Sequence, residues 1–479
     1  MSEAYKIHLG PAACAVDLGD GSERGEYVNQ DYILERLGRP HRAINLMYCY
    51  YPLDKGWPER ASKAHAHDDL NDVWDYPYDD YFPYGGGIGG NLDGEPFTFM
   101  RDVRRHGQDV CLTLTIDPFV GDEHIVAIAK DMAKFGRVTL RINHEATGNW
   151  FSFNKRASYE QVAAFFVHCC EIIHREAKNC QVVLCLDGCK DASEEKMVME
   201  EIFTEAAKAA DIVSVDRYMA LHWGWPVDIA EPGGTTFGRS KVKDIYEMAK
   251  KSYKRYIVMN DGVIKPMVMS ELNADGDVTG PYDQADMFTE FCDLLKNDPE
   301  RWLSGFTTYQ FRDRGRLGLE IESPNNPEVG IEQPLLGAYK KIIADEFFSP
   351  SQTVGEAAAL PLTLRWGSAE DSEGLAIPVK LEANPVFFEA YFEDELAGEN
   401  LMLCINNRWF YKAPGVKCVD LSGAFFEKPL TAPAELTLSL YAPPASGEND
   451  PSQGGDWQTN YYREIKSLPK LRIRYQPIL

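Results

Sequence analysis

The sequence predicts an α/β protein, with a (β/α)8 TIM barrel over residues 1–350 followed by a small antiparallel β-sandwich over residues 351–479. Short apolar runs alternate with helical patterns through the first part, and their number matches a closed barrel. After about Pro350 the helical patterns give way to short alternating runs separated by turn residues. A chain of 479 residues is long for one compact domain, so its length agrees with this division.

Eight apolar runs are the candidate barrel strands. They are residues 12–19, 42–51, 109–117, 137–145, 181–188, 211–218, 266–272 and 305–311. Strands that are apolar on both faces and alternate with helices indicate parallel pairing through right-handed crossovers. No glycine-rich dinucleotide loop follows the first run, so a closed barrel fits better than an open doubly wound sheet.

Helix and loop signals separate these runs. Residues 122–135 carry a helical apolar period and end before Gly136, a capping box begins a second helix at Ser158, and a third is predicted to begin at Asp191. Near the second domain, residues 349–358 are typical of a linker. Residues 446–457 predict a mobile loop.

Composition limits the classes of function. The formal net charge of -25 repels polyanions, so no nucleic-acid partner is expected. No run reaches the roughly 18 apolar residues of a membrane helix, and residues 1–10 lack the apolar core of a secretory signal. We therefore expect a soluble chain, cytoplasmic if its start is natural and secreted or periplasmic if a signal was removed. The eleven cysteines predict buried free thiols, and Cys180, Cys185 and Cys189 lack zinc-like pairing.

Two glutamates follow apolar runs. Glu145 lies in "RINHEATGNWF" (residues 141–151), and Glu271 lies in "VMSEL" (268–272). A buried carboxylate is costly unless it is paired, and the C-terminal ends of barrel strands build active sites. Cleavage of a glycosidic bond needs one protonated and one ionised carboxyl group. Glu145 and Glu271 are therefore the candidate catalytic pair.

Strand alternation adds a cation to this pair. Arg141, Asn143 and Glu145 share a parity, so the strand pattern predicts their side chains on one face. A guanidinium beneath two carboxylates favours the ionised form of one of them, which suits a nucleophile.

These segments resemble a known family. "RINHEATGNWF" resembles the strand-four motif of glycoside hydrolase family 26, which has Arg, two residues, His-Glu, a short gap, Gly and Trp. "VMSEL" is similar to the strand-seven nucleophile segment of the same clan, and "VSVDRY" (213–218) resembles its strand-six segment ending in Asp-x-Tyr. The resemblance extends over roughly residues 10–350. It implies a retaining, β-mannanase-like glycosidase that works by double displacement, with carboxyl groups about 5 Å apart.

The resemblance also implies roles for single residues. Glu145 corresponds to the acid/base, Glu271 to the nucleophile, His144 to a neighbour of the acid/base, Tyr218 to a hydrogen-bond partner of Glu271, and Trp150 to a sugar-contacting aromatic. The match departs from the family at Ala146-Thr147. It also departs after the eighth run, where "YQFRDRGR" stands in place of the tryptophan that the clan often has.

Further polar and aromatic residues at strand ends are candidates for binding a sugar. Besides Arg141, Asn143, His144, Trp150 and Tyr218, they are Tyr48, Tyr50, Asp117, Asp187, Trp223, Gln310 and Arg312. The segment 52–100 is too long for a simple connector and contains Trp57, Trp74, Tyr76, Tyr78, Tyr81, Phe82 and Tyr84. Its aromatic rings either stack on sugars or pack the segment onto the barrel. Its glycine-rich part, residues 84–91, predicts a flexible hinge.

Arg312, Arg314 and Arg316 form a basic cluster in an acidic protein. Guanidinium groups suit carboxylate or sulfate, so the glycan is a candidate to carry an acidic substituent. The alternative is pairing within the protein, with Asp313, Glu320 or Glu322.

No metal or organic cofactor is expected. His65 and His67 resemble a paired-histidine metal site but lie in a polar loop rather than at the end of the first strand. The expected partner is therefore an oligosaccharide or polysaccharide substrate, and the oligomeric state is left open. Two other functions compete with this one: a carbohydrate-binding protein without turnover, and a retaining glycosidase of another family in the same clan that acts on an acidic or sulfated glycan.

Overall fold

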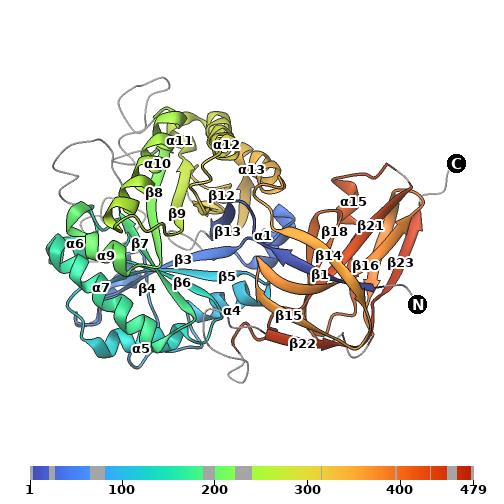
Figure 1. Cartoon of the computed structure of the whole chain (residues 1–479), viewed down its shortest axis with the longest axis horizontal. Coiled ribbons are helices and arrows are strands. Elements are labelled where there is room, and N and C mark those ends of the chain that lie inside the picture. The colour runs from blue at the N-terminus through green and yellow to red at the C-terminus, as the bar shows by residue number, and fades with distance from the viewer. Residues whose placement is uncertain are drawn as a thin grey trace.

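The computed structural model of the chain contains a barrel of strands and helices beside a β-rich part (Figure 1). It describes residues 4–20, 27–64, 81–186, 200–221, 240–313, 315–393, 396, 398–431, 433–449 and 461–475.

Eight parallel strands close the barrel. In order around it they are β2 (Ala15–Gly19), β3 (Ala43–Tyr50), β5 (Asp109–Ile116), β6 (Val138–Ile142), β7 (Cys180–Leu186), β8 (Ile212–Ala220), β9 (Met267–Ala274) and β10 (Gly305–Thr308), and β10 pairs with β2. The short β4 (Phe82–Pro83) adds to β3 outside this ring. Every predicted run overlaps one of the eight strands, so the TIM barrel is confirmed.

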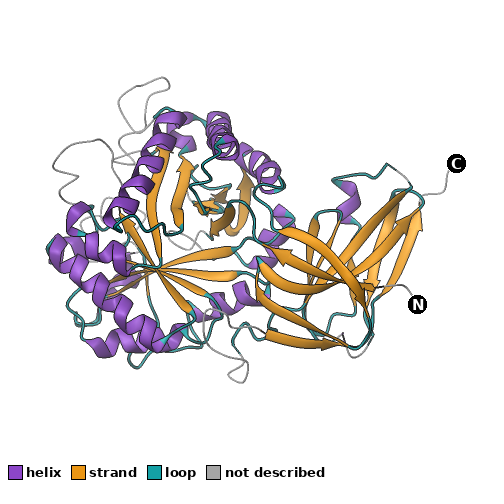
Figure 2. Ribbon diagram, in the orientation of Figure 1, coloured by secondary structure: helices purple, strands orange, loops and turns teal. Residues whose placement is uncertain are grey.

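Helices cover the outside of the barrel strands (Figure 2). They are α1 (Gln30–Leu37), α2 (Trp57–Ala64), α4 (Phe97–Arg105), α5 (Asp122–Met132), α6 (Ser152–Arg156), α7 (Tyr159–Glu176), α9 (Thr204–Ala209), α10 (Val242–Met259), α11 (Gly276–Thr279), α12 (Pro281–Asn297) and α13 (Pro334–Ile343). The predicted capping box at Ser158 is present at the start of α7. The predicted start at Asp191 lies outside the described residues. Among the described helices, none is long and apolar enough to span a membrane.

The barrel strands carry the hydrophobic core along their length and polar groups at their C-terminal ends. Fully buried apolar side chains such as Leu112, Leu140 and Leu184 belong to one hydrophobic cluster with residues of the surrounding helices. Burial of one such side chain contributes roughly 1.5–3 kcal/mol. This packing holds the strands in place, and their C-terminal ends are then free to carry polar groups.

The β-rich part contains two antiparallel sheets. The larger has the order β14-β1-β16-β21-β18-β19, with β15 paired to β16 and β22 paired to β15, and the smaller has the order β20-β17-β23. The strands are β1 (Ala4–Gly10), β14 (Ser351–Ala358), β15 (Leu362–Ser368), β16 (Asp371–Leu381), β17 (Pro385–Tyr391), β18 (Leu401–Ile405), β19 (Arg408–Lys412), β20 (Cys418–Asp420), β21 (Ala434–Tyr441), β22 (Tyr461–Ile465) and β23 (Lys470–Tyr475), with the short helix α15 (Gly423–Phe426). Ile377 of the larger sheet and Phe388 of the smaller belong to one hydrophobic cluster, which is the packing of a β-sandwich.

Two predictions about the ends of the barrel are wrong. β1 pairs with β14 and β16, so residues 4–10 lie in the sandwich rather than in the predicted barrel. Residues 351–358, predicted as part of a linker, form strand β14. Nearly all side chains of β14 are exposed, so its backbone ladder to β1 defines the strand and no apolar pattern marks it in the sequence. Otherwise the division at residue 350 stays a prediction.

A third, small sheet follows the last barrel strand. It contains β11 (Arg312–Asp313), β12 (Glu320–Ser323) and β13 (Asn326–Glu332). Its buried Glu320 accepts hydrogen bonds from Tyr32 and Arg36 of α1, so the sheet is tied to the helix after the first barrel strand.

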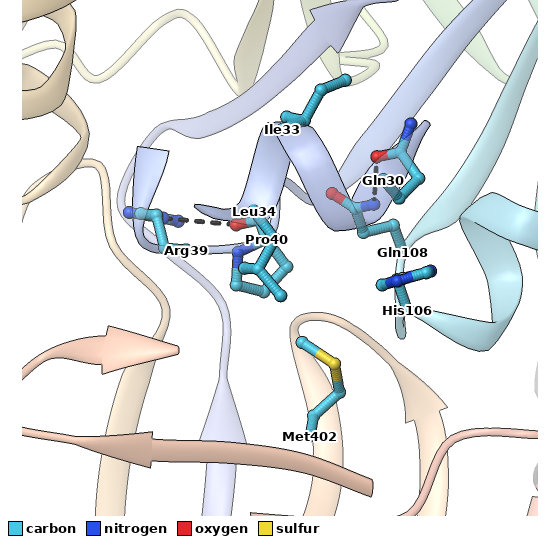
Figure 3. Close-up of a pocket in the computed structure, with 8 residues that line it drawn as sticks. All are labelled: Gln30, Ile33, Leu34, Arg39, Pro40, His106, Gln108 and Met402. Atoms are coloured by element: carbon cyan, nitrogen blue, oxygen red, sulfur yellow. Dashed lines mark hydrogen bonds between the residues drawn. The ribbon is translucent and has the colours of Figure 1, made fainter. Parts of the chain in front are cut away.

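The barrel and the sandwich share a packed boundary. Figure 3 shows a narrow pocket there, in which Met402 of β18 faces residues around α1 and the end of α4. The pocket is lined by Gln30, Ile33, Leu34, Arg39, Pro40, His106, Gln108 and Met402. Nearby, Arg137 donates to Asp371 at 3.0 Å and to Ser368 at 3.1 Å. Apolar packing and a charged pair therefore both join the two parts.

The cysteines follow the prediction of buried free thiols. Of the described cysteines, Cys418 is exposed and the other nine are buried, and none of these ten forms a disulfide.

Candidate active site

The first of the two predicted catalytic strands, β6, ends at Ile142, earlier than its apolar run suggested. Asn143 and Glu145 adopt left-handed backbone conformations, with φ of 47° and 50°. Such conformations are uncommon for residues other than glycine and cannot continue a strand. The predicted shared parity of Arg141, Asn143 and Glu145 therefore fails beyond Ile142. Only Arg141 projects its side chain from the strand itself.

Arg141 of β6 contacts side chains of three other barrel strands. Its Nη1 donates to both carboxylate oxygens of Asp216 on β8 at 2.9 and 3.0 Å, its Nη2 to Glu271 on β9 at 2.8 Å, and its Nε to Thr113 on β5 at 2.8 Å. The side chain is fully buried. Burial alone would lower the pKa of Arg141, but the two carboxylates raise it well above the ordinary value. A charged guanidinium therefore lies beneath the site, on the Glu271 side.

Glu271 lies within β9 and is only 6 % exposed. Its Oε1 accepts from Arg141, and its Oε2 accepts from the Tyr218 hydroxyl of β8 at 2.7 Å. Hydrogen bonds that are donated to a carboxylate favour its charged form. The predicted contact between Tyr218 and Glu271 is present in the structure.

Asp216 is a second buried carboxylate beside Glu271, and the two are paired in the β8–β9 register. Burial, followed by the charge of Glu271, raises the pKa of Asp216 to about 7, while Arg141 opposes the shift. Two carboxyl groups thus share one guanidinium, and the pKa of Asp216 is raised in this setting.

Glu145 lies in a less enclosed setting. Its side chain is partly exposed, and its Oε2 accepts the indole N–H of Trp150 at 2.7 Å. Gly148 makes this contact possible, because a Cβ at that position would lie 2.5 Å from the Trp150 ring. The spacing in "EATGNW" therefore folds the indole back over the turn and onto the carboxylate.

His144 directly precedes Glu145 in the chain, and its ring lies near Glu271. Its Nε2 is 3.8 Å from Glu271 Oε1 and 3.0 Å from the hydroxyl oxygen of Tyr81, and its ring packs on Phe151 at 4.5 Å. Burial, assisted by Arg141, lowers the pKa of His144 well below its ordinary value, so the ring is neutral. Tyr81 was noted in the sequence only as one of many aromatics in the segment 52–100. Nothing in the spacing connects it to a residue 63 positions later.

Several residues predicted to bind substrate are instead engaged within the protein. Asn143 exchanges two hydrogen bonds with the backbone of Ile116, at 2.6 and 3.1 Å, and so holds β5 against the exit of β6. Asp117 accepts from Arg156 at 2.9 Å and is 3 % exposed. Tyr48 is fully buried in the main hydrophobic cluster. These contacts favour structural roles over the predicted contacts with sugar.

The contacts of the arginine cluster favour the alternative that these residues pair within the protein. Arg312 donates to Glu320 at 2.9 Å and lies over the Tyr32 ring, while Arg316 lies 3.6 Å from Asp277. Gln310 is 2 % exposed and lies 3.4 Å from Asp313. Arg314, Asp187 and Trp223 lie outside the described residues. The hypothesis of an acidic substituent therefore gains no support from Arg312 or Arg316.

The described part of the segment 52–100 packs onto the barrel. Trp57, Tyr81 and Tyr84 are buried, which favours packing over open sugar platforms. The glycines of the predicted hinge make close contacts: a Cβ at Gly86 would lie 2.6 Å from Asp131, and Gly87, at φ 80°, donates its N–H to Asp131. The hinge itself stays a prediction. The glycines allow close approach in a compact turn. Trp74, Tyr76, Tyr78, His65 and His67 lie outside the described residues.

One group of side chains has the spacing of a metal site. Single ligand atoms of His144, Asp216 and Glu271 lie within 4.8 Å of one another. Arg141, however, already donates to both oxygens of Asp216 and to one of Glu271. Its guanidinium supplies the positive charge that these carboxylates need, and we assign no metal to the group.

The comparisons with known proteins find similar structures but no similar sequences. No protein-family model and no curated protein matches the chain. A β-mannanase of glycoside hydrolase family 26 from Bacteroides ovatus is 13% identical, covering 70% of this chain and 90% of that one, with a TM-score of 0.44. A modular endo-β-1,4-mannanase from Cellulomonas fimi is 11% identical, covering 90% of each chain, with a TM-score of 0.44. A family 51 α-L-arabinofuranosidase from Bifidobacterium longum is 10% identical, covering 92% of this chain and 100% of that one, also with a TM-score of 0.44.

All three are glycoside hydrolases. With identities of 10–13% and TM-scores below 0.5, the function of this chain has to be argued from its own site.

Proposed function

We propose that the protein is a retaining glycoside hydrolase that cleaves β-glycosidic bonds in an oligosaccharide or polysaccharide. Glu271 is the nucleophile and Glu145 is the acid/base. The observation that carries the proposal is the contrast between them: Glu271 is buried and accepts hydrogen bonds from Arg141 and Tyr218, while Glu145 is partly exposed and accepts the indole N–H of Trp150. Double displacement needs one carboxylate kept ionised and one carboxyl group able to exchange a proton.

The chemistry follows from these settings. In the first step Glu271 attacks the anomeric carbon and forms a glycosyl ester, while Glu145 gives its proton to the departing oxygen. In the second step Glu145 removes a proton from water, and the water displaces Glu271 with overall retention of configuration. Arg141, anchored by Asp216 on its other nitrogen, holds Glu271 in place through both steps.

The first test uses E271Q and E145Q with a panel of aryl glycosides and β-mannan, β-glucan, xylan and galactan oligomers. We expect E271Q to be inactive on every substrate. We expect E145Q to lose roughly 10²–10⁴-fold on poor leaving groups, the usual contribution of a general acid, and much less on dinitrophenyl glycosides. E373Q, an exposed sandwich glutamate, is the matched control and should behave as wild type.

Azide rescue assigns the two roles. In E271A, azide enters from the face that Glu271 vacates and gives a glycosyl azide of inverted configuration; in E145A, azide replaces water and gives the retained product. The reverse pattern would exchange the roles. If wild type is inert on the whole panel yet binds one of these glycans, the non-catalytic carbohydrate-binding function is favoured instead.

A further inference from the structure

Tyr81 and His144 form a buried contact that the proposed double displacement does not yet use. Tyr81 lies just before β4, which pairs with the end of β3, and His144 lies at the exit of β6. The hydroxyl oxygen of Tyr81 is 3.0 Å from His144 Nε2, and the two residues are 2 % and 1 % exposed. The segment 52–100 thus places a phenol directly against the candidate site.

The surroundings of His144 indicate which ring nitrogen carries the proton. Nδ1 is buried and has no hydrogen-bond partner among the described residues, whereas Nε2 faces two oxygens. A buried N–H without an acceptor is costly, so the proton of the neutral ring belongs on Nε2. Of the two oxygens, that of Tyr81 at 3.0 Å is within hydrogen-bond range, and Oε1 of Glu271 at 3.8 Å is not.

This arrangement matters for Glu271. Its two oxygens already accept from Arg141 and Tyr218. A third donor on Oε1 would stabilise the carboxylate further and make it a weaker nucleophile, because charge leaves the carboxylate as the glycosyl ester forms.

We propose that Tyr81 is a positioning residue: its hydroxyl oxygen accepts the Nε2–H of His144 and keeps this N–H off Oε1 of Glu271. The inference rests on the proposed function of Glu271. Tyr81 touches His144 and acts on the reaction through it.

The first experiment compares Y81F with Y84F. Tyr84 is equally buried and belongs to the same segment, but its hydroxyl contacts Asp131. In Y81F the His144 N–H turns to Glu271, and we expect kcat/KM on the dinitrophenyl glycoside that wild type cleaves fastest to fall about ten-fold, the effect of one net hydrogen bond, with KM nearly unchanged. Y84F should retain the wild-type value.

The pH profile gives a readout that packing alone would not move. Among the described residues, the charged and titratable groups with contacts to Glu271 include Arg141, Asp216, Tyr218 and His144. A new donor on Glu271 favours its ionised form, so the acidic limb of kcat/KM should move to lower pH by about one unit in Y81F.

A double-mutant cycle tests whether Tyr81 acts through His144. In the H144Q background, Y81F should have no further effect on the rate or on the pH profile. An unchanged effect of Y81F in that background would overturn the proposal, as would a Y81F profile identical to that of Y84F.

A final measurement does not depend on turnover. In protein labelled with ¹⁵N-histidine, with H144Q used for assignment, the proton should reside on Nε2 of His144. The resonance of this proton should move downfield in Y81F, because the N–H then points to the carboxylate of Glu271. In Y81F/E271Q the resonance should return towards its wild-type position. A proton on Nδ1, or a resonance that Y81F leaves unchanged, would overturn the proposal for Tyr81. This measurement needs no turnover, so its result is separate from the test of the proposed hydrolase function.

Discussion

The ends of β9 and β6 hold their glutamates in different ways. Glu271 stays within strand β9, beside a shift in the register with β8, and is almost fully buried. It accepts hydrogen bonds from Arg141 of β6 and from Tyr218 of the neighbouring strand β8. Glu145 lies beyond the end of β6 in a left-handed turn, is partly exposed and accepts an indole from its own turn. Sheet register therefore places the proposed nucleophile, whereas a local turn places the proposed acid/base.

The largest effect should come from removing the cation on the β9 side. R141M fills similar space but leaves Asp216 and Glu271 buried without their guanidinium. Breaking a buried ion pair by removing one partner costs about 3–5 kcal/mol, so we expect R141M to lose this much free energy of unfolding in urea denaturation, together with its activity.

The control is R316M, whose partly exposed pair with Asp277 should contribute less than about 1 kcal/mol. R141M/D216N should recover part of the loss, because one of the two unpaired carboxylates is gone. Equal denaturation midpoints for R141M and R316M would show that Arg141 does not balance the buried charge.

Asp216, beside Glu271, should make the free energy of unfolding depend on pH. Its pKa rises from 3.8 to about 7 on folding, because of burial first and Glu271 second, so the folded state binds the extra proton between these values. The stability from this proton is complete below about pH 4 and is lost as the pH rises to 7, with a slope approaching about 1.4 kcal/mol per pH unit.

D216N carries no such proton. Its free energy of unfolding, followed by urea denaturation from pH 4 to 7, should fall less than that of wild type, whereas D277N should keep the wild-type dependence. Parallel curves for D216N and wild type would exclude a tightly held proton on Asp216.

How far the sequence predicts this site depends on which rule places each residue. Alternating apolar runs predicted all eight barrel strands, and the position of Glu271 followed because β9 extends past that residue to Ala274. The same alternation failed for Asn143, since left-handed backbone carries no strand parity. Tyr81 could not be predicted, because only the closed barrel brings its segment against His144.

The turn after β6 provides the next comparison. In N143A, two buried hydrogen bonds to Ile116 are lost and a left-handed alanine is strained, so we expect a loss of about 2–3 kcal/mol in thermal or urea unfolding. N143G loses the same hydrogen bonds without the strain and should lose less than N143A. If N143G lost more free energy of unfolding than N143A, backbone strain at this position would not be a main cost, and side-chain packing in the turn would matter more.

The smallest effect should come from the indole on Glu145. W150F removes the N–H that lies 2.7 Å from Oε2 but retains an aromatic ring over Gly148. The loss of one hydrogen bond to the acid/base should lower kcat about ten-fold on substrates with poor leaving groups, which need the proton. Dinitrophenyl glycosides leave without it and should be cleaved by W150F as by wild type. An equal loss on both kinds of substrate would instead assign Trp150 to the sugar, and the contrast between β6 and β9 would then rest on exposure and backbone conformation alone.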